Sequence, residues 1–144
     1  MKNLTFLSLI ISLIMFSCAQ EEKSPIEGAW QLVSGEWGSI EETFPGQITG
    51  SDIKMWTKDC FAFVGKFQMD TVMIDNFGWG KYTLIEGIKY EENIMMHKTA
   101  PNLEGKTLKM LTEIRNDTLI QKWPVDDNWN LVENYSIEKY VRVK

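Results

Sequence analysis

Polar side chains that could do chemistry recur at every second position in segments rich in β-branched and aromatic residues. Tyr90 and Glu92 share one face of such a segment, and Glu138, Tyr140 and Arg142 share a face of another, because side chains of a strand alternate between its two sides. Two facing glutamates would be able to act as an acid–base pair. Any barrel with two inward glutamates matches this pattern as well, so its specificity for catalysis is small.

The sequence lacks the motifs of nucleophilic and phosphate chemistry. It contains no Gly-x-Ser-x-Gly elbow and no glycine-rich phosphate loop, and His97 is far from Cys60 along the chain. We interpret Cys60, within CFAFV, as a buried small apolar residue rather than a nucleophile. We therefore expect a protein that is not an enzyme.

His97 is the only histidine and thus the one imidazole available to a metal or to haem iron. Strand alternation puts it opposite Glu92, which predicts an exposed position next to a loop. No CxxC, HExxH or EF-hand loop accompanies it. We predict no metal and no cofactor, with haem binding through His97 as an alternative.

Cys18 ends the run LTFLSLIISLIMFSC, which follows Lys2. The run is shorter than the roughly 20 residues of a membrane-spanning helix, and its basic start, apolar core and small Ser17 are typical of a secretory signal. A cysteine at the cleavage point resembles the bacterial lipoprotein signal. That resemblance implies a signal peptide over residues 1–17 and a tether over residues 18–25 that carries lipid on Cys18. An uncleaved anchor or an ordinary secretory signal is the alternative.

The net charge and the residue after Cys18 limit the molecules and membranes with which the protein is expected to associate. The net charge is -5 without any basic run, which argues against nucleic acid and against anionic headgroups as partners. Membrane contact is therefore expected through the lipid on Cys18. By resemblance to lipoprotein sorting, Ala19 after the cysteine implies the outer membrane of the cell envelope, on either its periplasmic or its surface face.

From Gly28 onward, apolar runs alternate with turn signals such as Lys58-Asp59, Glu86-Gly87 and Asn116-Asp117. This predicts an all-β, antiparallel up-and-down meander of about eight strands that closes into a small barrel, with a two-sheet sandwich as the alternative. Longer connections are expected over 39–51, 68–80 and 99–105. The predicted strands are Ala29–Glu36, Ile53–Thr57, Phe61–Phe67, Lys81–Glu86, Lys89–His97, Thr107–Arg115, Thr118–Trp123 and Leu131–Arg142.

The segment IEGAWQLVSGEW, from Ile26 to Trp37, contains Gly28-Ala29-Trp30 and resembles the first strand of the lipocalin and fatty-acid-binding (calycin) superfamily. The resemblance implies that Trp30 packs near the closed end of a barrel against an arginine of the last strand, here Arg142. Such a cation–π contact contributes about 0.5–2 kcal/mol.

A narrower resemblance is to the lipocalin-like domains of small bacterial lipoproteins, and it is carried by GWGKYTL, KYEENI and EKYVRV. It implies a lipocalin-like barrel over residues 26–144 with an interior cavity, and no particular ligand. Residues 39–51 contain Pro45, unlike the helical pair of fatty-acid-binding proteins. Tyr140 precedes Arg142, whereas the fatty-acid carboxylate site has the reverse order. Both departures weigh against fatty-acid chemistry.

If these shared faces point inward, the interior is aromatic with a few polar groups, as in pockets for small hydrophobic or amphipathic molecules. The predicted ligand-binding residues are Phe61, Phe63, Tyr82, Tyr90, Glu92, Trp123, Tyr140 and Arg142.

The alternative is a barrel filled by its own side chains that serves as an interaction or accessory module of the cell envelope. Trp37, Trp79 and Trp129 lie in or beside predicted loops, where exposed indoles often mark protein contacts.

Overall fold

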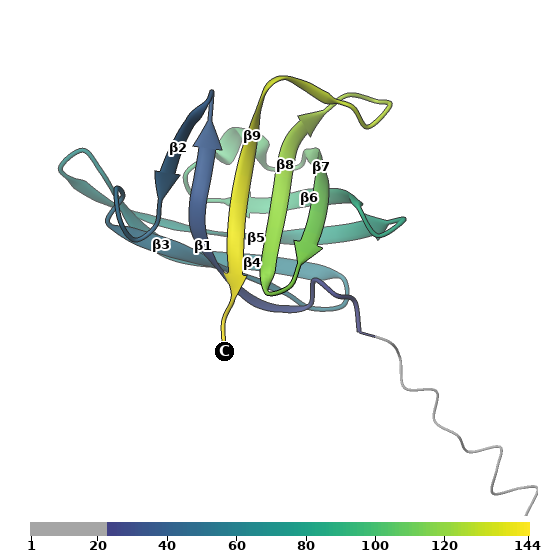
Figure 1. The fold of residues 1–144 in the computed structure, drawn as a ribbon, viewed down its shortest axis with the longest axis horizontal. Coiled ribbons are helices and arrows are strands. Elements are labelled where there is room, and N and C mark those ends of the chain that lie inside the picture. The colour runs from purple at the N-terminus through teal and green to yellow at the C-terminus, as the bar shows by residue number, and fades with distance from the viewer. Residues whose placement is uncertain (1–22) are drawn as a thin grey trace, which may run out of the picture.

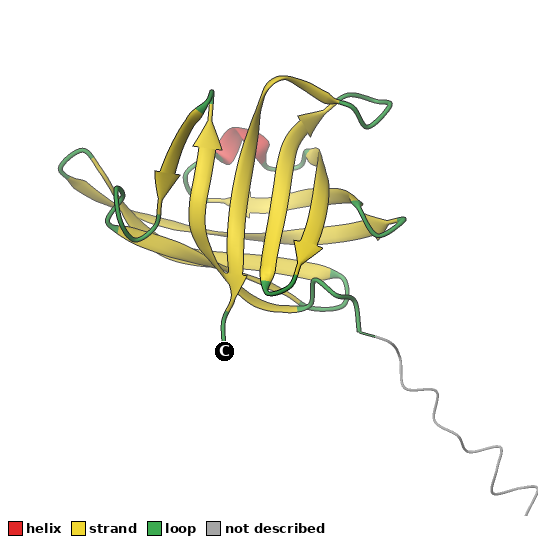
Figure 2. Cartoon of the chain, in the orientation of Figure 1, coloured by secondary structure: helices red, strands yellow, loops and turns green. Residues whose placement is uncertain are grey.

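The computed structural model describes residues 23–144, so the predicted signal peptide and Cys18 lie outside the described residues. The described chain is all-β, as predicted, with nine strands and a single 3-10 turn (Figures 1 and 2). The elements are β1 Gly28–Trp37, β2 Ile40–Thr43, β3 Gly50–Trp56, β4 Cys60–Met69, β5 Val72–Ile85, β6 Lys89–His97, η1 Pro101–Leu103, β7 Thr107–Arg115, β8 Thr118–Val125 and β9 Leu131–Arg142.

The strands form a closed barrel. From β3 to β9 each strand pairs with the next, and β1 pairs with both β3 and β9, so eight antiparallel strands close on themselves. The extra strand β2 pairs with the second half of β1, from Ser34 to Trp37. Closure removes the edges that a two-sheet sandwich would leave, and the predicted meander and barrel are therefore confirmed.

The strand boundaries differ from the prediction in two places. The predicted connection over 39–51 contains β2, and the predicted connection over 68–80 is a tight turn followed by most of the 14-residue β5. Gly78 and Gly80 weakened the strand signal there. In the barrel both glycines face inward, opposite Phe63 and Phe61 of β4. A Cβ on Gly80 would lie 2.8 Å from the Phe61 ring, so the glycines make room for these aromatic side chains.

The closed end of the barrel is filled around Trp30. Its indole is fully buried and donates from Nε1 to the Ile26 carbonyl at 2.8 Å. The Arg142 guanidinium carbon lies 4.0 Å from the centre of the indole, so the expected contact is present. Arg142 also donates to the carbonyls of Glu27 and Pro25, each at 3.0 Å. These contacts anchor the entering chain across the closed end.

Gly28 is required at this end for two reasons. Its φ of +126° lies in a region that side chains disfavour. A Cβ at this position would also lie 2.9 Å from Arg142 Nη1. The Gly-x-Trp pair and the arginine are thus one packing unit.

Candidate functional site

The other half of the barrel, toward η1, contains a cavity of about 180 Å³. An engineered cavity of about 150 Å³ binds benzene, whereas pockets for drug-sized ligands measure about 300–1,000 Å³. The cavity therefore accommodates a molecule of roughly one-ring size. It is lined by Leu32, Asp52, Lys54, Phe63, Asn76, Glu92, Ile94, His97, Leu103, Leu108, Met110, Trp123, Glu138 and Tyr140.

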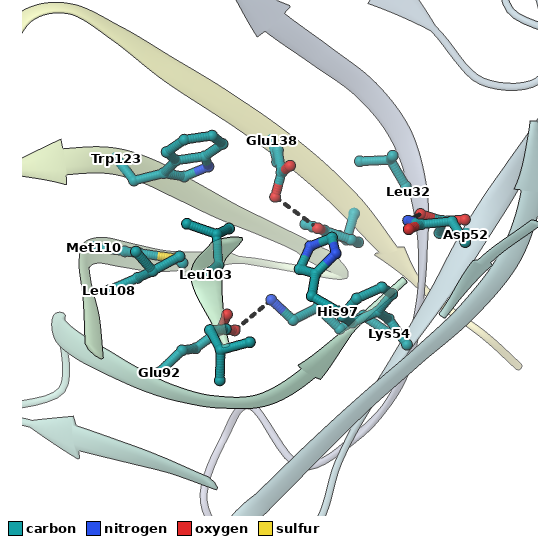
Figure 3. Close-up of a pocket in the computed structure, with 14 residues that line it drawn as sticks. Leu32, Asp52, Lys54, Glu92, His97, Leu103, Leu108, Met110, Trp123 and Glu138 are labelled. Carbon is teal, nitrogen blue, oxygen red and sulfur yellow. Dashed lines mark hydrogen bonds and ion pairs between the residues drawn. The ribbon is translucent and has the colours of Figure 1, made fainter. Parts of the chain in front are cut away.

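The cavity has two unlike walls (Figure 3). Leu103 of η1, Leu108 and Met110 of β7 and Trp123 of β8 gather on one side and form the apolar wall. Asp52 and Lys54 of β3 lie across from it, next to Leu32 of β1. Together with Glu92 of β6, which reaches toward Lys54 from below the apolar residues, they form the polar wall (Figure 3). A surface divided in this way suits an amphipathic molecule, because the apolar wall contributes affinity and the polar wall orients the ligand.

Lys54 and Glu92 form a buried ion pair in the polar wall, and their side chains are 8% and 4% exposed. Lys54 also donates to Gln121 Oε1 at 3.3 Å, and its ammonium lies about 5 Å from the centres of the Trp56 and Phe61 rings. The network extends deeper, since the hydroxyl of Tyr90 donates to Glu92 at 2.8 Å. Burial of Tyr90, together with the charge of Glu92, raises the pKa of its phenol well above the usual value.

Glu138 of β9 projects toward the cavity between the two walls (Figure 3). Its carboxylate accepts a hydrogen bond of 2.8 Å from the hydroxyl of Tyr140. Burial raises the pKa of Glu138, and the ammonium of Lys54 offsets that shift only in part. The ionised carboxylate therefore lacks full compensation from the described residues.

Asp52 is the third carboxyl of the cavity. Its Oδ2 accepts a hydrogen bond from Asn76, which in turn accepts one from Thr99 at 2.8 Å. Its Oδ1 is buried without a partner among residues 23–144, and burial raises the pKa of the carboxyl. Asp52 on β3 and Asn76 on β5 meet across β4 because Gly65, which pairs with both, has no side chain.

His97 points into the cavity, so its predicted exposed position was wrong. The physical reason is a β-bulge. Ile94 pairs with Gly80 and Met96 pairs with Trp79, which leaves Met95 as an extra residue in β6. An extra residue reverses the alternation beyond it, and His97 therefore joins the inner face, opposite Gly78.

The imidazole of His97 is held by the η1 loop. Nδ1 accepts the backbone N–H of Ala100 at 3.1 Å, and the backbone N–H of His97 donates to Glu104 at 3.1 Å. Burial lowers the pKa of the imidazole, and the nearby Lys54 lowers it further. In the neutral ring an accepting Nδ1 puts the proton on Nε2. This removes the lone pair with which Nε2 would bind haem iron, and the cavity is also far smaller than a macrocycle.

The predicted ligand-binding residues divide between the two halves of the barrel. Four of them line the cavity, namely Phe63, Glu92, Trp123 and Tyr140. The other four lie outside the cavity lining, namely Phe61, Tyr82, Tyr90 and Arg142. The second group is committed to packing: the Tyr82 and Tyr90 rings stack with centroids 5.4 Å apart, and Phe61 is buried beneath Lys54.

Sequence reasoning missed the polar residues of β3. In SDIKMW, the apolar Ile53 and Met55 would be expected inside, yet Asp52, Lys54 and Trp56 are buried and Ile53 and Met55 are exposed. The signal that was available is Trp56, because a large indole sets the inward face, and alternation then puts Lys54 and Asp52 on that face.

The outward-facing Ile53 and Met55 of β3 are part of an exposed apolar patch on the outside of the barrel. Across β3, β4 and β5, the register aligns Ile53 with Val64 and Phe77, and Met55 with Ala62 and Trp79. The large members of the patch are 36–52% exposed. Single exposed apolar residues are ordinary, whereas a contiguous group on a sheet face often marks a contact surface.

The three tryptophans predicted in or beside loops have different environments. Trp79 lies within β5 and is exposed. Trp37 is half-buried and packs edge-on against Phe44 with ring centroids 6.1 Å apart. Trp129 is half-buried, and the ammonium groups of Lys89 and Lys109 lie 5.9 and 5.6 Å from its ring centre.

Other reactive groups are sparse. Cys60 is a free, half-buried thiol rather than the buried residue expected, and its burial, together with Asp59, raises its pKa. Residues 23–144 contain no group of three or more His, Cys, Asp or Glu side chains placed to hold a metal ion. Within the same residues, no helix has the length and apolar character needed to cross a membrane. Neither the protein-family models nor the curated proteins contain a match to this chain.

Proposed function

We propose that this protein is a lipid-anchored, lipocalin-like lipoprotein that binds a small hydrophobic or amphipathic molecule without a covalent bond. The observation that carries the proposal is the two-walled cavity of about 180 Å³ in the half of the barrel toward η1. The protein would be a carrier or receptor of its ligand rather than an enzyme.

The packing of the barrel supports a functional cavity. The closed end is filled by buried side chains such as Trp30, Phe61 and Leu119, so the barrel is capable of dense packing. In the other half, Asp52 Oδ1 is buried beside the open space and has no hydrogen-bond partner within the described part of the chain. A buried polar atom without a partner costs about 1–3 kcal/mol. Such a cost is understandable where a ligand supplies the missing partner.

Native mass spectrometry tests ligand binding directly. The chain from Ala19 onward would be measured before and after exposure to an envelope lipid extract. We expect a discrete added mass, which Leu108→Trp should abolish because its indole fills the cavity. Leu111→Trp, which changes the opposite face of the same strand, is the matched control and should keep the added mass. An apo mass throughout would reject the proposal.

The anchor is tested separately at Cys18. Cys18→Ser should block lipid attachment and leave the precursor unprocessed. After cell fractionation, the wild-type protein is expected in the outer-membrane fraction. Normal membrane anchoring of the variant would reject the lipoprotein assignment and leave the cavity proposal standing.

A second candidate function, the interaction module, is favoured by the exposed apolar patch on β3, β4 and β5. The partner in this case would be a second copy of this chain, because each copy carries the same apolar sheet face. Two such faces stack about 10 Å apart in sheet packing. In this case the outer wall rather than the cavity would be the functional surface.

Sedimentation velocity over a range of concentrations tests the second candidate. A dimer that Val64→Glu dissociates would support it, because Val64 lies at the centre of the patch and is 52% exposed. Thr83→Glu, an exposed outward substitution further along β5, is the control. A monomer at all concentrations would reject self-association.

A further inference from the structure

The charges of the cavity are unbalanced. Among residues 23–144, three carboxyl groups line it, those of Asp52, Glu92 and Glu138, against one ammonium, that of Lys54. Lys54 contacts Glu92 directly. The imidazole of His97 adds no stable positive charge because burial lowers its pKa. Two carboxyl groups therefore exceed the cationic groups that line the cavity.

The two excess carboxyls have hydrogen-bond capacity left. Glu138 is bonded by the hydroxyl of Tyr140, and Asp52 is bonded by the amide of Asn76, with Oδ1 unpaired. A carboxylate has about four acceptor sites on its two oxygens. Both groups can thus accept further N–H donors from a molecule in the cavity.

An anionic ligand would find few partners in this cavity. The ammonium of Lys54 is already neutralised by Glu92 and bonded to Gln121. The guanidinium of Arg142 is held at the closed end by Trp30 and the backbone. An anion would instead face Glu138 and Asp52, and like charges at short range in a partly buried site repel strongly.

A cation would find complementary groups at Glu138 and on the adjacent apolar wall. Glu138 projects into the space beside the indole of Trp123 (Figure 3). A carboxylate makes charge-assisted hydrogen bonds to an ammonium group, and an indole attracts a cation by its ring quadrupole. Leu108 and Met110 offer apolar surface to the remainder of the molecule.

We propose that the ligand of this cavity is a small primary amine, with its ammonium on Glu138 and an apolar body of about one-ring size against Trp123 and Leu108. This inference rests on the proposed binding function and specifies the chemical class of its ligand. The amine supplies one of the two positive charges that the cavity lacks. Because burial favours the neutral form of Glu138 in the empty cavity, binding of the amine should release protons and tighten as the pH rises from 4 to 7.

Calorimetric titration with three probes of one carbon skeleton tests the charge. Benzylamine, benzyl alcohol and benzoate would each be titrated into the chain from Ala19 onward, which keeps every residue of the barrel. At pH 7 we expect benzylamine to bind at least about tenfold more tightly than either of the others, since one charge-assisted hydrogen bond contributes about 1.5–3 kcal/mol. Equal or tighter binding of benzyl alcohol or benzoate would overturn the amine assignment.

Variants locate the contact. Glu138→Gln keeps the shape of the side chain and removes its charge, and should reduce the preference for benzylamine over benzyl alcohol to within about threefold. Glu113→Gln, on an exposed carboxylate of β7 that pairs with Arg115, should leave the preference unchanged. A preference that persists in Glu138→Gln would overturn the role of Glu138.

The outcomes for the inference and for the proposed function are separable. If an envelope molecule adds mass in the native spectrum but benzylamine shows no preference, the cavity binds ligands and the amine class is wrong. If neither the probes nor an envelope molecule bind, both the inference and the proposed function are rejected.

Discussion

The two halves of the barrel are built from the same strands but differ in packing and in charge compensation. At the closed end, the fully buried Trp30 donates to the carbonyl of Ile26 and lies against the guanidinium of Arg142. In the other half, Asp52 and Glu138 face a cavity and are only partly compensated. The comparison indicates that stability is concentrated in one half, which allows the other half to keep charged groups in an open space.

The largest expected difference between the halves is the cost of removing a side chain. Trp30→Ala should destabilise the protein by roughly 3–5 kcal/mol, because it opens a cavity in a filled core. Leu108 is itself half-buried and already borders the cavity, so Leu108→Ala should cost less, about 1 kcal/mol. Denaturant unfolding at pH 7 measures both. Equal costs would contradict the division into a filled and an open half.

Lys54 joins the two halves, since it pairs with Glu92 at the cavity and lies over Trp56 and Phe61 of the core. Lys54→Met should destabilise by about 3 kcal/mol, because it leaves the Glu92 carboxylate buried without its partner. The double substitution Lys54→Met with Glu92→Gln should recover most of that loss, since no buried charge then remains at the pair. A double variant as unstable as Lys54→Met alone would show that packing rather than charge sets the cost.

The contact between Trp30 and Arg142 can be isolated with a double-mutant cycle. Trp30→Phe and Arg142→Lys each weaken the contact while keeping an aromatic ring and a cation. We expect a coupling free energy of about 0.5–2 kcal/mol from unfolding of the four proteins. Strictly additive effects would show that the guanidinium acts through its backbone hydrogen bonds alone.

The closed end was easier to predict from the sequence than the cavity, because a short motif marks the closed end and no comparable motif marks the cavity. The closed end rests on Gly28, Trp30 and Arg142, and the resemblance carried by the Gly-x-Trp motif implied their contact, which the structure contains. The cavity depends on features that act between strands: the bulge at Met95 that turns His97 inward, and glycines of β4 and β5 that admit neighbouring side chains. Lys54 and Asp52 were missed because the apolar Ile53 and Met55 favour the opposite face of β3, and within that strand Trp56 is the residue that indicates the observed one.

Glu138→Gln should stabilise the empty protein. Burial raises the pKa of this carboxyl. At neutral pH the ionised carboxylate is therefore less favourable in the folded state than in the unfolded state. Removing the charge should add roughly 1 kcal/mol at pH 7, the scale of an uncompensated buried polar group. The gain should vanish below about pH 4.5, where the carboxyl is protonated in both states. Unfolding of the wild type and the variant at pH 7 and pH 4 measures this, and a loss of stability at pH 7 would contradict it.

The smallest expected effect concerns His97, whose pKa is lowered by burial, with Lys54 adding to the shift. A base with a lowered pKa binds its proton less readily in the folded state, so stability declines as the pH falls below about 6.5 toward the folded pKa. His97→Asn offers an acceptor near the position of Nδ1 for the Ala100 N–H without a titrating group. Its unfolding free energy relative to the wild type should therefore rise between pH 7.5 and pH 5, while the carboxyl contributions of Asp52 and Glu138 cancel in the difference. A constant difference over that range would show that His97 titrates as a solvent-exposed imidazole, and that the inward position created by the bulge is not maintained in solution.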